Sequence, residues 1–147
     1  MNARLSERLA VVATIDPDAY GIGTQTTDII DMKNRRRVLF VVMAGDLGTN
    51  GTLDFNVYGS AASDMSGAGL ITGKSITQLT QAGTDSDKQV IVEVTAEEVA
   101  AQGYRYIRGN LVIGTATSDA AVLALAGDLA YSPASEYDLS SVDEIVA

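Results

Sequence analysis

The sequence contains no cysteine and no histidine among its 147 residues. Without cysteine, the chain can form neither a disulfide framework nor a thiolate metal site. Without histidine, it lacks the commonest general base at neutral pH and the commonest ligand of transition metals. These two absences predict a protein that is not an enzyme and that uses no metal and no cofactor.

Positive charge and long apolar runs are also scarce. Ten Lys and Arg stand against 19 Asp and Glu, which gives a formal net charge of −9. Because nucleic-acid affinity rests chiefly on basic side chains that neutralise phosphates, neither DNA nor RNA is expected as a partner. No segment approaches the roughly 20 apolar residues of a membrane span, and no signal-peptide cleavage pattern follows the short run 9–15. We therefore expect a soluble protein that is made in the cytoplasm and does not contact a membrane.

The chain is rich in small and β-branched apolar residues, which make up most of its 46% apolar fraction, and it has only two Phe, six Tyr and no Trp. Such a composition supports one domain with a core of many small side chains. The clearest one-sided pattern covers 52–58, where Leu53, Phe55 and Val57 alternate with polar residues. Further strands are predicted at 27–32, 37–43, 88–94, 104–113 and 120–126.

One helix is predicted. Thr95 is followed three residues later by Glu98, which is a capping-box pattern, so a short helix should cover Ala96–Ala101 and end at Gly103. The region 59–87 shows no long helical period and is expected to be a surface excursion. Six or so strands with one short helix predict a mainly β protein, an antiparallel β-sandwich or jelly roll.

The chain divides into three parts on these patterns: an N-terminal arm (1–24), a β-sandwich domain (25–134) and an acidic C-terminal tail (135–147). The arm is inferred from the amphipathic opening 5–9 and from the turn residues at 16–18. Arms of this kind often contact a neighbouring molecule.

Basic side chains concentrate at 33–37, where Lys33 and Asn34 are followed by three consecutive arginines. Such a cluster docks an acidic partner surface by charge complementarity, or it is simply a solvated turn. Together with the arm, it gives the predicted partner-binding residues, which are Arg4, Leu5, Arg8, Leu9, Arg35 and Arg36.

The acidic pairs Asp16/Asp18, Asp85/Asp87 and Asp143/Glu144 are the obvious sources of ligands for a hard cation. None has the ligand spacing of a calcium-binding loop, and Asp serves routinely in turns. We therefore predict solvated turns and a solvated tail at these pairs.

Two tyrosines, Tyr104 and Tyr106, share a predicted strand with Arg105 and Arg108. Aromatic rings on a sheet surface would stack on a carbohydrate. Packing in the core or at a sheet edge is the favoured reading, because the chain has few aromatic residues and no Trp.

Several segments resemble a group of small tailed-phage virion structural proteins of the capsid decoration (cement) type. They are 5–10, 27–32 leading into 36–39, 73–79, and 104–108. The resemblance implies a protein on the capsid surface that stabilises the head shell by binding junctions of the major capsid protein. Two alternatives remain open, namely a tail-tube or head-to-tail joining protein, and a carbohydrate-binding module on the virion surface. The strand at 104–113 also resembles a late strand of galactose-binding-like jelly rolls.

Decoration proteins commonly gather at local symmetry axes, so the resemblance also implies a homotrimer. Small residues that would let subunits approach closely in such a trimer occur at Ala61, Ala62, Gly67 and Gly69.

Overall fold

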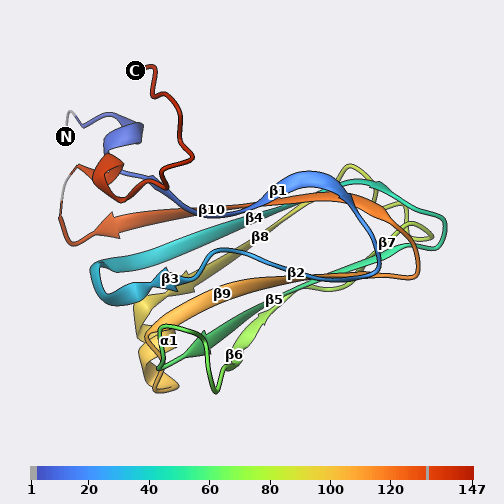
Figure 1. Ribbon diagram of the computed structural model, residues 1–147, viewed down its shortest axis with the longest axis horizontal. Coiled ribbons are helices and arrows are strands. Elements are labelled where there is room, and N and C mark those ends of the chain that lie inside the picture. Colours follow the sequence, from blue (N-terminus) through green and yellow to red (C-terminus); the bar gives the residue numbers. More distant parts are fainter. Residues whose placement is uncertain (1–2, 132) are drawn as a thin grey trace.

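The computed structural model describes residues 3–131 and 133–147, which form two antiparallel sheets packed face to face (Figure 1). Sheet A has the order β1-β10-β4-β8. Its strands are β1 (Ala10–Tyr20), β10 (Ser118–Leu129), β4 (Arg35–Leu47) and β8 (Gln89–Thr95).

Sheet B has the order β2-β9-β5-β6. Two short strands extend it, since β3 pairs with β9 and β7 pairs with β5. The strands of this sheet are β2 (Gly23–Thr26), β3 (Ile30–Asp31), β5 (Thr52–Ser60), β6 (Gly69–Ser75), β7 (Leu79–Thr80) and β9 (Tyr106–Gly114).

The path of the chain is that of a jelly roll. Consecutive long strands lie in opposite sheets except at the β5–β6 hairpin, and the antiparallel pairs are β1 with β10, β2 with β9, β4 with β8, and β5 with β6. This nesting of pairs is the double Greek key of eight-stranded jelly rolls. The predicted fold class is thereby confirmed.

The predicted helix is also confirmed, as α1 (Ala96–Ala101), which connects β8 to β9. The Thr95 hydroxyl accepts a hydrogen bond from the Glu98 N–H at 3.2 Å, and the Glu98 carboxylate accepts one from the Thr95 N–H at 2.9 Å. Three short 3-10 turns complete the described part of the chain: η1 (Leu5–Glu7), η2 (Met32–Asn34) and η3 (Ala134–Tyr137). None of its helices is long and apolar enough to cross a membrane.

The core lies between the sheets and is centred on two phenylalanines. Phe40 of β4 and Phe55 of β5 are both fully buried, with ring centroids 5.4 Å apart. The other inward positions carry mainly Val, Ile, Leu and Ala. The core therefore consists mainly of aliphatic side chains that pack around one aromatic pair.

The expectation of an arm at 1–24 is wrong for 10–20, which form edge strand β1. Val12, Ala13 and Ile15 are buried in the core. The strand tolerates Pro17 because the pairing with β10 shifts register between Ile15 and Asp18, and an irregular edge strand needs no N–H there. Only the described residues 3–9 lie outside the sheets at this end; residues 1 and 2 lie outside the described part of the chain.

Two further expectations differ from the structure. Of the strand predicted at 27–32, only β3 forms. The side chains of Thr27 and Asp28 instead bind backbone groups of other segments. Thr27 Oγ1 accepts a hydrogen bond from the Gly109 N–H, and the Asp28 carboxylate accepts one from the Thr14 N–H. The excursion predicted at 59–87 contains β6 and β7, because Ile71 and Leu79 are buried and hold this region to sheet B.

Candidate interaction surface

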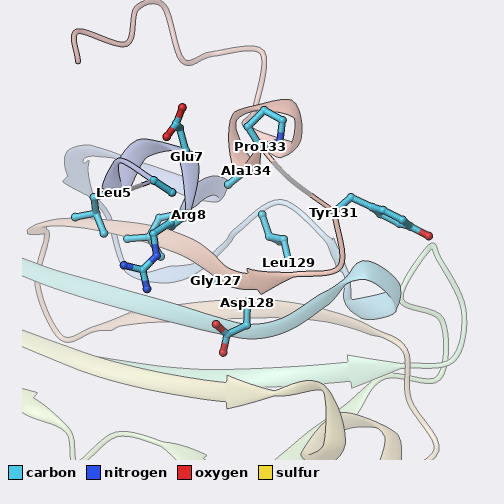
Figure 2. Close-up of a pocket in the computed structure, with 11 residues that line it drawn as sticks. Leu5, Glu7, Arg8, Gly127, Asp128, Leu129, Tyr131, Pro133 and Ala134 are labelled. Carbon is cyan, nitrogen blue, oxygen red and sulfur yellow. The ribbon is translucent and has the colours of Figure 1, made fainter. Parts of the chain in front are cut away.

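Residues 3–9 and the segment that follows β10 lie at one end of the sandwich (Figure 1), where they border an open hollow of about 680 Å³. We call it the terminal hollow. Figure 2 shows side chains from η1, from the end of β10 and from η3 around it; its main apolar lining is Leu5, Leu9, Leu129, Tyr131, Pro133 and Ala134. Leu5 and Tyr131 are about two-thirds exposed, at 66% and 65%. The hollow therefore offers accessible apolar surface.

The segment that forms one wall of the hollow has defined local structure. The Arg4 N–H donates to the Glu7 carboxylate at 2.8 Å, and the Leu9 N–H donates to the Leu5 carbonyl at 3.0 Å. These bonds satisfy backbone groups of the short turn η1 and hold Arg8 and Leu9 at the hollow.

The C-terminal segment is tied to the same end of sheet A. The Val11 N–H donates to the Asp138 carboxylate at 2.6 Å, and the Leu139 N–H donates to the Val11 carbonyl at 2.8 Å. These bonds occupy the free edge of β1 at Val11, which blocks edge-to-edge pairing with another chain there.

The structure brings together three of the six predicted partner-binding residues, because Leu5, Arg8 and Leu9 all line the terminal hollow. Arg4 lies one residue before η1 and is exposed, and Arg36 is exposed on β4. Within the described residues, neither Arg4 nor Arg36 forms an ion pair.

Arg35 has an internal role. Its Nη1 donates to the Asp31 carbonyl at 2.7 Å, and its guanidinium lies 5.4 Å from the centre of the Tyr137 ring. Burial lowers the pKa of Arg35 below its usual value. Arg35 thus connects β4 with η3, and its neighbour Arg36 faces solvent.

A second surface, which the sequence did not single out, is the outer side of sheet A. On β4 and β10 the positions between core residues are also apolar. These outer side chains, with Ile91 of the adjacent β8, form what we call the sheet A face: Leu39, Val41, Met43, Ile91, Leu123 and Leu125. Ile91 is 62% exposed and Met43 is 42% exposed. The signal was available in the sequence, because strands that are apolar at every position are typical of sheets covered on both sides.

The outer side of sheet B has a different composition. On β5 the positions that alternate with the core are Thr52, Asp54, Asn56 and Tyr58, and on β9 they include Arg108 and Asn110. This is the usual alternation of a sheet with one face in solvent. Sheet A therefore has an apolar outer side, whereas the outer side of sheet B is mainly polar.

Both ends of the sheet A face carry acidic side chains. At the end near the terminal hollow, Arg37 forms ion pairs with Asp128 (3.3 Å) and Glu93 (3.7 Å). At the far end, Asp18, Asp87 and Asp119 line a hollow of about 540 Å³ beside Met43, which we call the acidic hollow. Among residues 3–131 and 133–147, these three carboxylates form no ion pair with Lys or Arg.

The acidic pairs of the sequence do not assemble into a metal centre. Within the described ranges, no group of three or more acidic side chains is placed to hold an ion. Asp85 instead accepts hydrogen bonds from the Thr80 N–H at 3.0 Å and from Lys88 Nζ at 2.7 Å, which stabilise the turn after β7.

The three tyrosines that could form an aromatic platform for a carbohydrate, Tyr58 of β5, Tyr104 and Tyr106, are all half-buried. Tyr104 covers Gly59 and Gly69, where an added Cβ would collide with its side chain. Tyr106 has the Arg105 guanidinium 5.1 Å from its ring centre. The small size of Gly69 is therefore explained by contact within the chain, and a subunit contact is not needed to account for it.

Asp31 forms the best-defined ion pair of the molecule. Its carboxylate accepts from Arg105 Nε at 2.8 Å and from Arg105 Nη2 at 2.7 Å, which connects β3 to the residue before β9. The hydrogen bonds from Arg105 lower the pKa of Asp31, with help from the Lys33 N–H. Similar hydrogen bonds lower the pKa of Asp85 and of Glu98.

These depressed pKa values predict acid sensitivity. A carboxyl group whose pKa is lowered by folding stabilises the protein above its unfolded-state pKa, and this stabilisation is lost as the pH falls through the folded-state pKa. Asp31→Asn should therefore lower the free energy of unfolding at pH 7 by roughly 0.5–1.5 kcal/mol, because the pair is partly exposed and screened. It should also lose less stability than the unmodified chain between pH 6 and pH 3. Urea unfolding at both pH values checks this, with Asp143→Asn in the exposed tail as control; equal acid losses for all three chains would contradict it.

No family model matches the chain, and no curated protein sequence matches it. Among solved structures, a chain of the infectious bursal disease virus Gx strain is similar over 86% of this chain, with 12% identity and a TM-score of 0.38. A chain of the Gt strain of that virus also aligns over 86%, with 10% identity and a TM-score of 0.42. The xylan-binding module CBM15 aligns over 88% of this chain and 96% of its own length, with 7% identity and a TM-score of 0.36. The present chain spans only about a third of the two viral chains (34% and 33%), and the likenesses concern the fold alone.

Proposed function

We propose that this chain is a non-enzymatic structural protein of a virus particle, a decoration protein that binds the outside of a tailed-phage capsid. Jelly rolls of this topology recur both in viral capsid domains and in carbohydrate-binding lectin domains, so the fold alone leaves two classes of function. Which surface of the molecule exposes side chains suited to binding decides between a capsid function and carbohydrate binding.

The observation that carries the proposal is the terminal hollow. A lectin-like site would present exposed aromatic rings on a sheet, whereas Tyr58, Tyr104 and Tyr106 are half-buried. The exposed apolar side chains Leu5 and Tyr131 lie instead at the rim of a wide hollow between residues 3–9 and the segment that follows β10. Apolar anchors around an open hollow suit the surface of another protein.

The proposed partner is the major capsid protein at junctions between its subunits. Residues 3–9, with Arg4 and Arg8, would insert at the junction, and the apolar rim of the hollow would pack on the shell. Each contact is small, but many copies on one shell add up to avidity and oppose its rupture. The chain would be made in the host cytoplasm and reside on the capsid surface.

The proposal predicts that Leu5→Asp weakens binding to particles by about tenfold or more, because burying a leucine contributes about 1.5–3 kcal/mol and 1.4 kcal/mol is a factor of ten. Purified chain is added to particles that lack it, and co-sedimentation gives the affinity. The matched control is Ile22→Asp, since Ile22 is equally exposed (69%) but lies between β1 and β2, away from the terminal hollow.

Equal binding of the Leu5→Asp variant and the unmodified chain would contradict the proposed surface. Binding to isolated tails in place of capsids would favour the tail-tube or joining function. Binding to glycans and not to particles would favour the carbohydrate-binding function.

A further inference from the structure

Two sheet edges lie close together beside α1, because β8 ends sheet A and β6 ends sheet B. Within the described residues, neither strand has a second neighbour in its own sheet. Such an edge presents backbone N–H and C=O groups that pair readily with a strand of another chain. The sequence of β8 increases this tendency, because Val90, Ile91 and Val92 are three consecutive β-branched apolar residues.

On β6, one side chain occupies the free edge. The Thr72 N–H donates to Gln102 Oε1 at 2.8 Å, and Gln102 Nε2 donates to the Leu70 carbonyl at 3.2 Å. The amide of Gln102 thus makes the two kinds of hydrogen bond that the backbone of an added strand would make. Gln102 is held in place as the C-cap of α1, where its own N–H donates to the Val99 carbonyl at 3.3 Å.

On β8, an ion pair occupies the free edge. Lys74 Nζ donates to the Glu93 carbonyl at 2.7 Å and lies 2.9 Å from a carboxylate oxygen of Glu98. The same carboxylate accepts from the Thr95 N–H at 2.9 Å. Glu93 and Thr95 are two residues apart, so their backbone groups point to the same edge. On both strands, therefore, a carbonyl and the N–H two residues later are covered by side chains.

Lys74 is placed for this contact by an irregularity in β6. The pairing of β6 with β5 shifts register between Asn56 and Tyr58, and Gly73 has a φ of +76°. A bulge of this kind changes the direction of nearby side chains, and Lys74 reaches β8. Its side chain is only 18% exposed, although it lies on an edge strand. The ammonium group has lost much of its hydration, which its two oxygen partners offset.

We propose that Lys74, Glu98 and Gln102 form an edge cap, which prevents a second copy of this chain from adding its strands to β6 and β8. The free edge of β1 is covered in a comparable way, since the Asp138 and Asp28 carboxylates accept hydrogen bonds from its backbone. The inference goes beyond the proposed function and is independent of it, because strand addition at β6 and β8 does not involve the terminal hollow.

The first test compares Gln102→Ala with Gln78→Ala in the full chain. Gln78 is the matched control, because its amide binds the side chain of Asp54 at 2.7 Å and not a strand edge. Gln102→Ala should lower the protein concentration at which thioflavin-positive assembly begins by about tenfold or more, since each lost bond is worth roughly a factor of two to ten. Gln78→Ala should change that concentration by about twofold or less. Circular dichroism checks that both variants are folded.

The second test concerns β8 and compares Lys74→Met with Lys88→Met. Both variants lose one positive charge, but Lys88 Nζ binds the Asp85 side chain at 2.7 Å in a turn. Lys74→Met should begin to assemble at a concentration roughly two to ten times lower than Lys88→Met, because only Lys74→Met uncovers the β8 carbonyl.

Amide hydrogen exchange shows where assembly occurs. The Thr72 N–H should exchange faster in soluble Gln102→Ala than in the unmodified chain, and it should be protected again in the assembled protein, where a second copy pairs with β6. Assembly of Gln102→Ala at the concentration of the unmodified chain or of Gln78→Ala would overturn the proposal. Equal values for the two lysine variants, or an assembled protein with an unprotected Thr72 amide, would also overturn it.

Discussion

Phe55→Ala is expected to lower the free energy of unfolding by about 3–5 kcal/mol, the largest effect of any single change considered. Phe55 is fully buried at the centre of β5, and its ring packs on Phe40 of the opposite sheet at 5.4 Å. The other core side chains near this pair are mostly small or β-branched, so they cannot fill the cavity that the ring would leave. Equilibrium unfolding in urea measures the change.

A matched control for this substitution is Asn56→Ala on the same strand. Asn56 points to the outer side of sheet B, so its removal should change stability by about 1 kcal/mol or less. If Phe55→Ala also lowered the free energy of unfolding by less than about 1 kcal/mol, the aromatic pair would not organise the core.

Gly109→Ala is expected to lower the free energy of unfolding by about 1–3 kcal/mol through overpacking. An added Cβ at Gly109 of β9 would lie 2.5 Å from Cζ and 2.7 Å from Cε2 of the Phe55 ring, and 3.2 Å from Cγ2 of Thr27. The missing side chain is therefore what allows the ring to lie over β9. Urea unfolding again gives the magnitude.

The Gly109 effect should depend on the ring that causes it. In the Phe55→Leu background, Gly109→Ala should be less destabilising, because two residues in contact are energetically coupled. Gly21→Ala serves as control, since nothing lies within 4 Å of a Cβ at that position. Equal penalties at Gly109 in both backgrounds would show that the clash is not with Phe55.

Local sequence signals predicted the parts of this fold that depend on neighbouring residues. The helix α1 follows from Thr95 and Glu98, which lie three residues apart and satisfy each other's backbone groups. Strand β5 follows from the strict alternation of Leu53, Phe55 and Val57 with polar residues.

Elements that depend on distant partners were harder to predict. The Asp16-Pro17-Asp18 segment has the composition of a turn, yet it lies in β1 because β10, about a hundred residues later, supplies the pairing partner. Likewise, Ile71 holds β6 to sheet B through core contacts that no local pattern reveals.

In the terminal hollow, too, some residues could be predicted from neighbouring residues and others depend on distant parts of the chain. Leu5, Arg8 and Leu9 were predicted from the amphipathic opening of the chain, and they do lie together. The other wall of the terminal hollow, with Leu129 and Tyr131, comes from the opposite end of the chain and depends on the pairing of β1 with β10. Sequence patterns could identify one wall but not the hollow.

If this chain attaches to a virus shell through its terminal hollow, cryo-electron microscopy of the particle that carries it should show density over junctions between major capsid proteins, with η1 and η3 facing the shell. Density confined to the tail or neck, or a capsid-bound chain whose terminal hollow faces solvent, would contradict it.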